Sequence, residues 1–73
     1  MRGVVQSFDP DKGIGIICGQ DGGRYPVTRA DIQRLETLAI GQRVYFSVRF
    51  VNNHAFATNV GKLKPSQKKA LND

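Results

Sequence analysis

Residues Lys12 to Ile17 read KGIGII, and the fold prediction starts from this short stretch. Two glycines alternate with two isoleucines in an apolar run that directly follows a turn signal, DPDKG (9–13). In a β-strand this alternation places the glycines on one face and the isoleucines, Ile14 and Ile16, on the other. Either these isoleucines belong to a core, or they stand where another molecule binds.

The size and the composition of the chain favour a small binding domain. Its 73 residues make one domain, which is too small for a deep catalytic cleft. Eleven Lys and Arg oppose six Asp and Glu, and the net charge of +5 favours an anionic partner. The sequence has no apolar run of membrane-spanning length and no signal peptide, and its single cysteine, Cys18, excludes an internal disulfide. We therefore expect a cytoplasmic protein without a membrane partner.

Turn signals at intervals of about ten residues separate five predicted strands. The strands are VVQSF (4–8), GIGII (13–17), RYPVT (24–28), RVYFSVRFV (43–51) and AFATNV (55–60). A short helical turn follows the third strand, with Thr28 as its candidate cap. Because closing such a sheet removes its unpaired edges, the sequence predicts an all-β, five-stranded, closed antiparallel barrel.

Alternation within the longest strand predicts one face made by Val44, Phe46, Val48 and Phe50. With Val5, Ile17 and Val27, most of these residues supply an interior that does not need Ile14 or Ile16. Phe50 and Phe56 flank the turn NNH (52–54) of the last hairpin, where we expect them to pack in the core or against each other across the strands.

The chain divides into a barrel domain, residues 1–60, and a basic, flexible C-terminal tail, residues 61–73. The tail holds four lysines and one acidic residue, so it carries +3 of the net charge and the first sixty residues carry +2. Two interpretations of its lysines remain open, a solvated segment and an electrostatic contact with nucleic acid.

The order and spacing of these motifs resemble the bacterial cold-shock protein family, whose fold is a five-stranded barrel of the OB type. The resemblance covers about residues 1 to 60 and is carried by Gly3, Val5, Phe8, Lys12-Gly13, Gly15, Ile17, Asp21-Gly22-Gly23, Val27, Ile32, Gly41-Gln42, Val44, Phe46, Val48, Ala57, Asn59 and Val60. In that family, single-stranded RNA or DNA lies across strands one to three. A Trp-Phe pair, a KGFGFI run and a VFVHI run supply the rings on which bases stack.

Most of those rings are missing from this chain. The Trp position holds Ser7, and the two Phe positions of KGFGFI hold Ile14 and Ile16. In the third strand, Pro26 and Thr28 stand where the family has Phe and His. Losing four stacking positions at ~1–3 kcal/mol each removes ~4–12 kcal/mol, whereas a micromolar complex has only about 8 kcal/mol in total. The resemblance therefore implies weak binding.

The first predicted function is non-enzymatic, weak binding of single-stranded RNA or DNA, mainly through phosphates. Tyr25 would replace one ring if its strand slips or bulges by one residue. The predicted nucleic-acid contacts are Arg2, Phe8, Lys12, Ile14, Ile16, Arg24, Tyr25, Thr28 and Arg29. The alternative is protein–protein contact or a homodimer through an aliphatic patch that includes Ile14, Ile16 and Pro26.

The sequence predicts no catalytic residue, no metal, no cofactor and no small-molecule substrate. Cys18 and His54 are the only residues of their types, so neither has a second ligand of its own kind for a metal. The aspartates Asp9, Asp11 and Asp21 lie in predicted turns, where hydrogen bonding to the backbone accounts for them.

Overall fold

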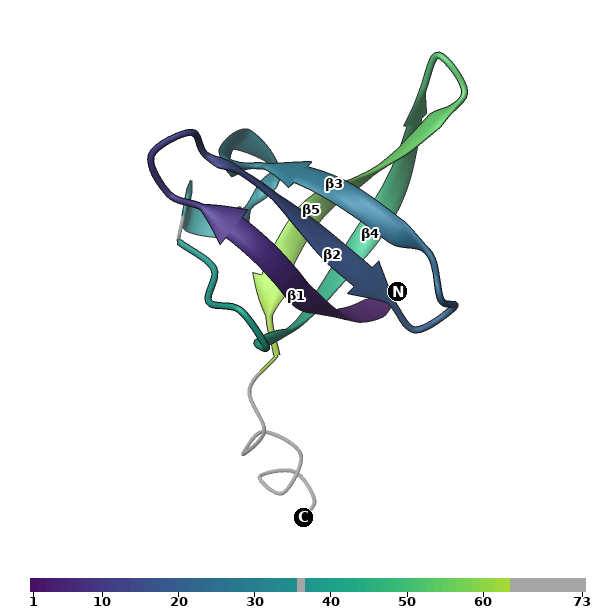
Figure 1. The fold of residues 1–73 in the computed structure, drawn as a ribbon. Coiled ribbons are helices and arrows are strands. Elements are labelled where there is room, and N and C mark those ends of the chain that lie inside the picture. The colour runs from purple at the N-terminus through teal and green to yellow at the C-terminus, as the bar shows by residue number, and fades with distance from the viewer. Residues whose placement is uncertain (36, 64–73) are drawn as a thin grey trace.

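A computed structural model describes residues 1–35 and 37–63 of the chain, with the side chain of residue 35 left out, and the structural statements below concern these residues. Five strands form one antiparallel sheet in the order β3-β2-β1-β4-β5 (Figure 1). They are β1 (Arg2–Asp9), β2 (Ile14–Gly19), β3 (Arg24–Thr28), β4 (Arg43–Val51) and β5 (His54–Lys62). Two 3-10 helices, η1 (Arg29–Asp31) and η2 (Gln33–Leu35), follow β3.

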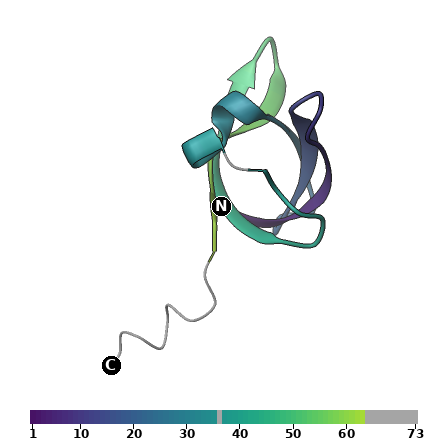
Figure 2. The same ribbon diagram turned by 90° about the vertical axis from the view of Figure 1, so that its left-hand side faces the viewer.

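The sheet is strongly curved, so that its edge strands β3 and β5 approach each other (Figure 2). A parallel bridge joins Ile32, just after η1, to Val60 of β5. No hydrogen-bonded ladder joins β3 to β5 within the described part of the chain. The prediction of an all-β, five-stranded antiparallel fold with a helical turn after the third strand is confirmed, whereas closure into a barrel is not.

The core fills the inside of this curved sheet and contains the residues expected there. Val5, Ile17, Val27 and Val44 are at most 1% exposed, and Phe46 packs beside them with its ring 5.3 Å from that of Tyr25. Other members come from the segment after β3 and from β5: Ile32, Leu38, Ala57 and Val60. Burial of these apolar groups at ~25 cal/mol per Å² is the main force that holds so short a chain together.

The glycines of KGIGII have two different structural roles. Gly13 ends the turn between β1 and β2 with φ +70°, a backbone conformation that favours glycine. Gly15 lies on the inward face, where an added Cβ would stand 2.8 Å from Cδ1 of Phe8. The isoleucines that alternate with them, Ile14 and Ile16, point outward, and Ile14 is 48% exposed. Neither Ile14 nor Ile16 belongs to the core.

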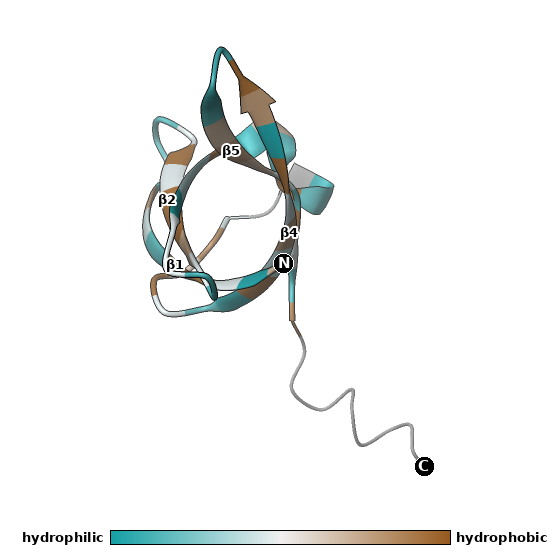
Figure 3. Cartoon of the chain, turned by 90° about the vertical axis from the view of Figure 1, so that its right-hand side faces the viewer, coloured by the Kyte–Doolittle hydropathy of each residue, from teal (hydrophilic) through white to brown (hydrophobic). Residues whose placement is uncertain are grey.

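The hairpin of β4 and β5 projects beyond the rest of the sheet (Figure 1). Asn52 and Asn53 turn it with φ of 51° and 68°, the left-handed values that a two-residue hairpin turn requires. β1 pairs with β4 only at its first residues, through Arg2–Val4, so the tip of the hairpin lies beyond the part of β4 that pairs with β1. Apolar residues nevertheless continue onto it (Figure 3).

Two expectations for this hairpin are wrong because it leaves the body of the sheet. Phe50 is 71% exposed rather than buried with Val44 and Phe46. It stands opposite Ala55, and Phe56 stands opposite Arg49, so the two phenylalanines do not face each other across the strands. β5 also runs on through Lys62, past the boundary predicted at residue 60. The predicted flexibility of residues 64–73 lies outside the described part of the chain.

Candidate nucleic-acid interface

The outward face of β1, β2 and β3 is the surface that corresponds to the predicted ligand site. The strand registers place Ile16 between Ser7 of β1 and Pro26 of β3. In the next row, Ile14 lies between Asp9 and Thr28. One surface therefore gathers the five positions at which this chain lacks the rings of the cold-shock family: Ser7, Ile14, Ile16, Pro26 and Thr28.

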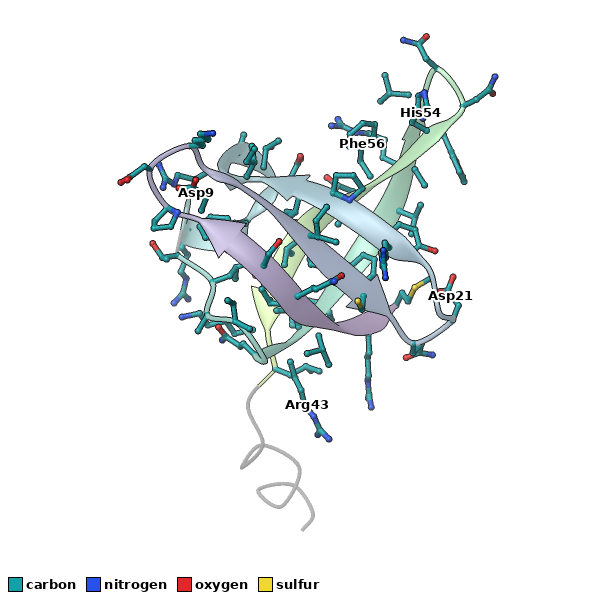
Figure 4. All side chains as sticks on the ribbon, viewed as in Figure 1. Asp9, Asp21, Arg43, His54 and Phe56 are labelled. Carbon is teal, nitrogen blue, oxygen red and sulfur yellow. The ribbon has the colours of Figure 1, made fainter. Side chains whose placement is uncertain are left out.

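These side chains line an open hollow of about 530 Å³, which we call the apolar groove. Its apolar lining consists of Phe8, Ile14, Ile16, Pro26, Val27, Ile40 and Phe56. Ile40 reaches it from the segment before β4, where the Gly41 N–H donates to the carbonyl of Val5 at 2.8 Å. Phe56 comes from β5 (Figure 4). Sequence reasoning missed Ile40 and did not place Phe56 here, because both come from segments that only the curvature of the sheet brings close.

Phe8 is shared between the groove and the core. β1 has a bulge between Val5 and Ser7, and past this bulge Phe8 stands opposite Gly15 on the inward side. The ring is half-buried and packs against the core cluster while still lining the groove. Because a base needs an open ring face for stacking, Phe8 offers less to a ligand than the sequence predicts.

Tyr25 lies in the core and not on the outward face. The register of β2 with β3 runs without a shift from Ile14–Thr28 to Cys18–Arg24, so the slip or bulge that would turn Tyr25 outward is absent. Its hydroxyl donates to Oδ2 of Asp21 at 2.6 Å, at the outer end of the core. The physical reason is strand alternation: Pro26 takes the outward position beside it.

The contact between Tyr25 and Asp21 shifts the pKa of both groups. The hydrogen bond from Tyr25, together with one from the Gly23 backbone N–H, lowers the pKa of Asp21 below its ordinary value of 3.8. The same bond to Asp21 raises the pKa of Tyr25 above 10.0, and burial adds to this shift. The carboxylate of Asp21 therefore stays ionised and fixes the turn between β2 and β3.

The turn between β1 and β2 holds Lys12 and Arg29 near one end of the groove. Asp9 accepts hydrogen bonds from the backbone N–H groups of Asp11 and Lys12, at 3.0 and 3.3 Å, as an aspartate does in such a turn. The guanidinium of Arg29 donates to the carbonyl of Pro10 and packs against Gly13. Lys12 is exposed, whereas Arg29 is half-buried and holds the turn against η1.

Thr28 begins η1, as predicted, but its hydroxyl does not cap the helix backbone. It donates instead to Oδ2 of Asp31 at 3.1 Å. Asp31 also accepts from the hydroxyl of Thr58 and lies 3.7 Å from the guanidinium of Arg49. This cluster ties η1 to β5, so Thr28 has a structural partner at the border of the groove.

The opposite end of the same face carries a line of arginines. Pairing places Arg24 of β3, Cys18 of β2, Val4 of β1 and Arg43 of β4 side by side, and we call this set the arginine row. Arg2 lies two positions before Val4 on β1, and it lines a shallow hollow of about 410 Å³ with Val4, Cys18 and Arg43. Arg2 and Arg24 are predicted contacts, whereas Arg43 is not, because only the register with β1 reveals its position.

Comparison of the sequence with known proteins does not assign the chain to a family. No protein-family model matches the chain, and no curated protein is significantly similar to it. Within residues 1–35 and 37–63, no group of three or more His, Cys, Asp or Glu could hold a metal ion. No helix among the same residues is both long and apolar enough to cross a membrane.

Proposed function

We propose that this chain is a non-enzymatic, cytoplasmic protein of the cold-shock type that binds single-stranded RNA or DNA weakly, through the outward face of β1 to β3. The proposal includes a closed barrel of the OB type. Its support is the central position of β1 between β2 and β4, together with the approach of β3 to β5. In OB barrels the face of strands two and three binds oligonucleotides. The cytoplasmic assignment rests on the use of a single cysteine.

The observation that carries the proposal is the outward position of Ile14 and Ile16, in a fold whose interior is complete without them. Because the side chains on this face do not pack in the core, the face is available for a ligand. Exposed cations, Lys12 at one end and Arg2 and Arg24 at the other, supply contacts for phosphates. The aliphatic side chains of Ile14, Ile16 and Pro26 offer no π-face to a base, so affinity comes mainly from counterion release.

A titration of labelled oligo-dT and oligo-U at two salt concentrations tests this function. We expect binding at low salt that weakens steeply as salt rises, with about 0.7 unit of slope in log K against log salt for each phosphate contact. Little preference between the two oligonucleotides is expected, since phosphate contacts carry no sequence information. Absence of binding at low salt would reject the proposal.

The apolar groove favours a second function, self-association through the same face. Seven apolar side chains line the groove, and Ile40 among them is 72% exposed. Exposed apolar patches of this kind mark protein contact surfaces. Sedimentation of the chain at high concentration, alone and with Ile14→Lys, tests this function. Val51→Lys is the matched control, because Val51 is 44% exposed at the tip of the hairpin, against 48% for Ile14.

Self-association through the groove predicts that the Ile14→Lys variant is monomeric while the Val51→Lys variant still associates. A wild-type chain that remains monomeric at high concentration would leave nucleic-acid binding as the function of this face. If the Val51→Lys variant is the one that dissociates, the contact lies at the hairpin instead.

A further inference from the structure

The arginines at this end of the face differ from Arg29 and Arg49 in their contacts with the rest of the described chain. Among the described residues, the side chains of Arg2, Arg24 and Arg43 make no hydrogen bond and no ion pair, whereas Arg29 binds the carbonyl of Pro10 and Arg49 lies near Asp31. The nearby turn does contain a carboxylate, Asp21. Its two oxygens already accept hydrogen bonds, from Tyr25 and from Gly23.

The spacing of the row suits a chain of phosphates. Arg24 and Arg43 are separated by two intervening strands, which puts their backbones about 14 Å apart at about 4.8 Å per strand. Between them lie only Val4 and Cys18, which are short, and Gly19 follows Cys18 in the same hollow. The middle of the row therefore has short, uncharged side chains, and a guanidinium group lies on each side of it. A planar guanidinium binds phosphate oxygens in pairs.

We infer that the arginine row, with Arg2, is a phosphate-binding subsite for the backbone of a single-stranded nucleic acid, distinct from the apolar groove. This inference rests on the proposed function and assigns its electrostatic part to one end of the face. A single-stranded nucleic acid that runs along β2 crosses both the arginine row and the apolar groove. Its phosphates then lie on the arginines while its bases extend toward Ile16 and Pro26.

Nucleic acid fits this surface better than an acidic polypeptide does. The arginine row continues on the same strands into a hollow walled by apolar groups and the rings of Phe8 and Phe56. Nucleotides combine an anionic backbone with flat apolar faces at regular intervals, which matches a cationic surface followed by an apolar one. A polyanion without bases would use only the arginine row.

The only cysteine of the chain allows a direct test, because Cys18 lies in the middle of the row and is half-buried. Its rate of alkylation by iodoacetamide is measured with and without oligo-dT at low salt. In parallel, the salt slope of oligo-dT binding is measured for the wild type, Arg24→Gln and Arg43→Gln. The matched control is Arg49→Gln, which removes the same charge from β4 six residues beyond Arg43, about 20 Å along the strand.

The inference predicts that oligo-dT slows alkylation of Cys18 severalfold. It also predicts that Arg24→Gln and Arg43→Gln each reduce the salt slope by about 0.7, whereas Arg49→Gln leaves the slope unchanged. If the wild type binds oligo-dT but Cys18 stays fully reactive and all three variants behave alike, the subsite is refuted while the proposed function stands. If the wild type does not bind, both fail.

Polyglutamate of matched charge is the remaining probe. Weaker protection of Cys18 by polyglutamate than by oligo-dT supports the assignment to nucleic acid. Equal or stronger protection would overturn that assignment in favour of an acidic polypeptide.

Discussion

The two ends of the outward face of β1 to β3 differ in chemistry although the same three strands run through both. At one end, the apolar groove gathers Ile14, Ile16 and Pro26, and the acidic Asp9 also lines it. At the other end, the arginine row presents guanidinium groups around Val4 and Cys18 that have no hydrogen-bond or ion-pair partner among the described residues. Stacking and phosphate binding are separate contributions to affinity, so a face can lose the first at one end and keep the second at the other.

The largest expected effect comes from restoring rings to the groove. The triple change Ser7→Trp, Ile14→Phe and Ile16→Phe adds three stacking positions at about 1 kcal/mol or more each, which raises the affinity for oligo-dT by roughly a hundredfold. The gain should persist at high salt, since stacking does not depend on counterions. Fluorescence titration at two salt concentrations measures both effects.

The control for this change is Val51→Phe, which adds an exposed ring outside the groove, at the tip of the hairpin. If that variant gains as much affinity as the triple variant, the groove is not the place where bases lie. A triple variant with unchanged affinity would show that the ligand takes another path across the protein.

A change beneath the groove should destabilise the fold more than a change in the arginine row. Gly15→Ala places a Cβ against Phe8 and the backbone of Ser7, and overpacking of this kind costs about 1–3 kcal/mol. The melting temperature then falls by roughly 5 °C or more. In Cys18→Ala only one side-chain hydrogen bond is lost, at 3.1 Å to Gln6, so its melting temperature should fall less. Equal losses in thermal unfolding would mean that Phe8 moves away from Gly15 at little cost.

The contribution of the groove to binding can be isolated at Phe56. The substitution Phe56→Leu keeps an apolar side chain but removes the aromatic ring on which a base can stack. The affinity for oligo-dT should therefore fall by about 1 kcal/mol, or roughly fivefold. Phe50→Leu makes the same chemical change at the exposed tip of the hairpin and should leave affinity unchanged. A loss in the Phe50 variant, and none in the Phe56 variant, would place the ligand on the hairpin.

The smallest effect concerns the turn beside the arginine row and appears as a pH dependence. Because the folded state lowers the pKa of Asp21, its bond with Tyr25 stabilises the fold above pH 3.8, and this contribution is lost as the pH falls through the lowered value. Because the pKa of Tyr25 is raised, its contribution is present below pH 10.0 and is lost as the pH rises through the raised value.

Tyr25→Phe removes this bond, so its stability should change less with pH than that of the wild type, both below pH 3.8 and above pH 10.0. Urea unfolding at several pH values measures the difference. Parallel curves for the two proteins would mean that the bond contributes nothing to stability.

Alternation along single strands was enough to predict much of the fold and part of the site. It predicted five strands, a turn after the third, the buried Val5, Ile17, Val27 and Val44, and the outward Ile14 and Ile16. The aspartate turns were equally predictable, since Asp9 and Asp21 bond to backbone groups two or three residues away. These features depend on interactions between residues that are close together in the chain, and such residues can be identified from the sequence.

Other features depend on where distant strands end and meet, so they can be seen only in the folded chain. Phe50 fits the inward pattern of β4 but is exposed, because β1 stops pairing with β4 long before it. Tyr25 is inward because the register of β2 with β3 has no shift. Ile40 and Phe56 join the groove, and Arg43 joins Arg24, across strands far apart in the chain. Period-two alternation assigns a side chain to a face, but the register and the curvature of the sheet determine its neighbours there.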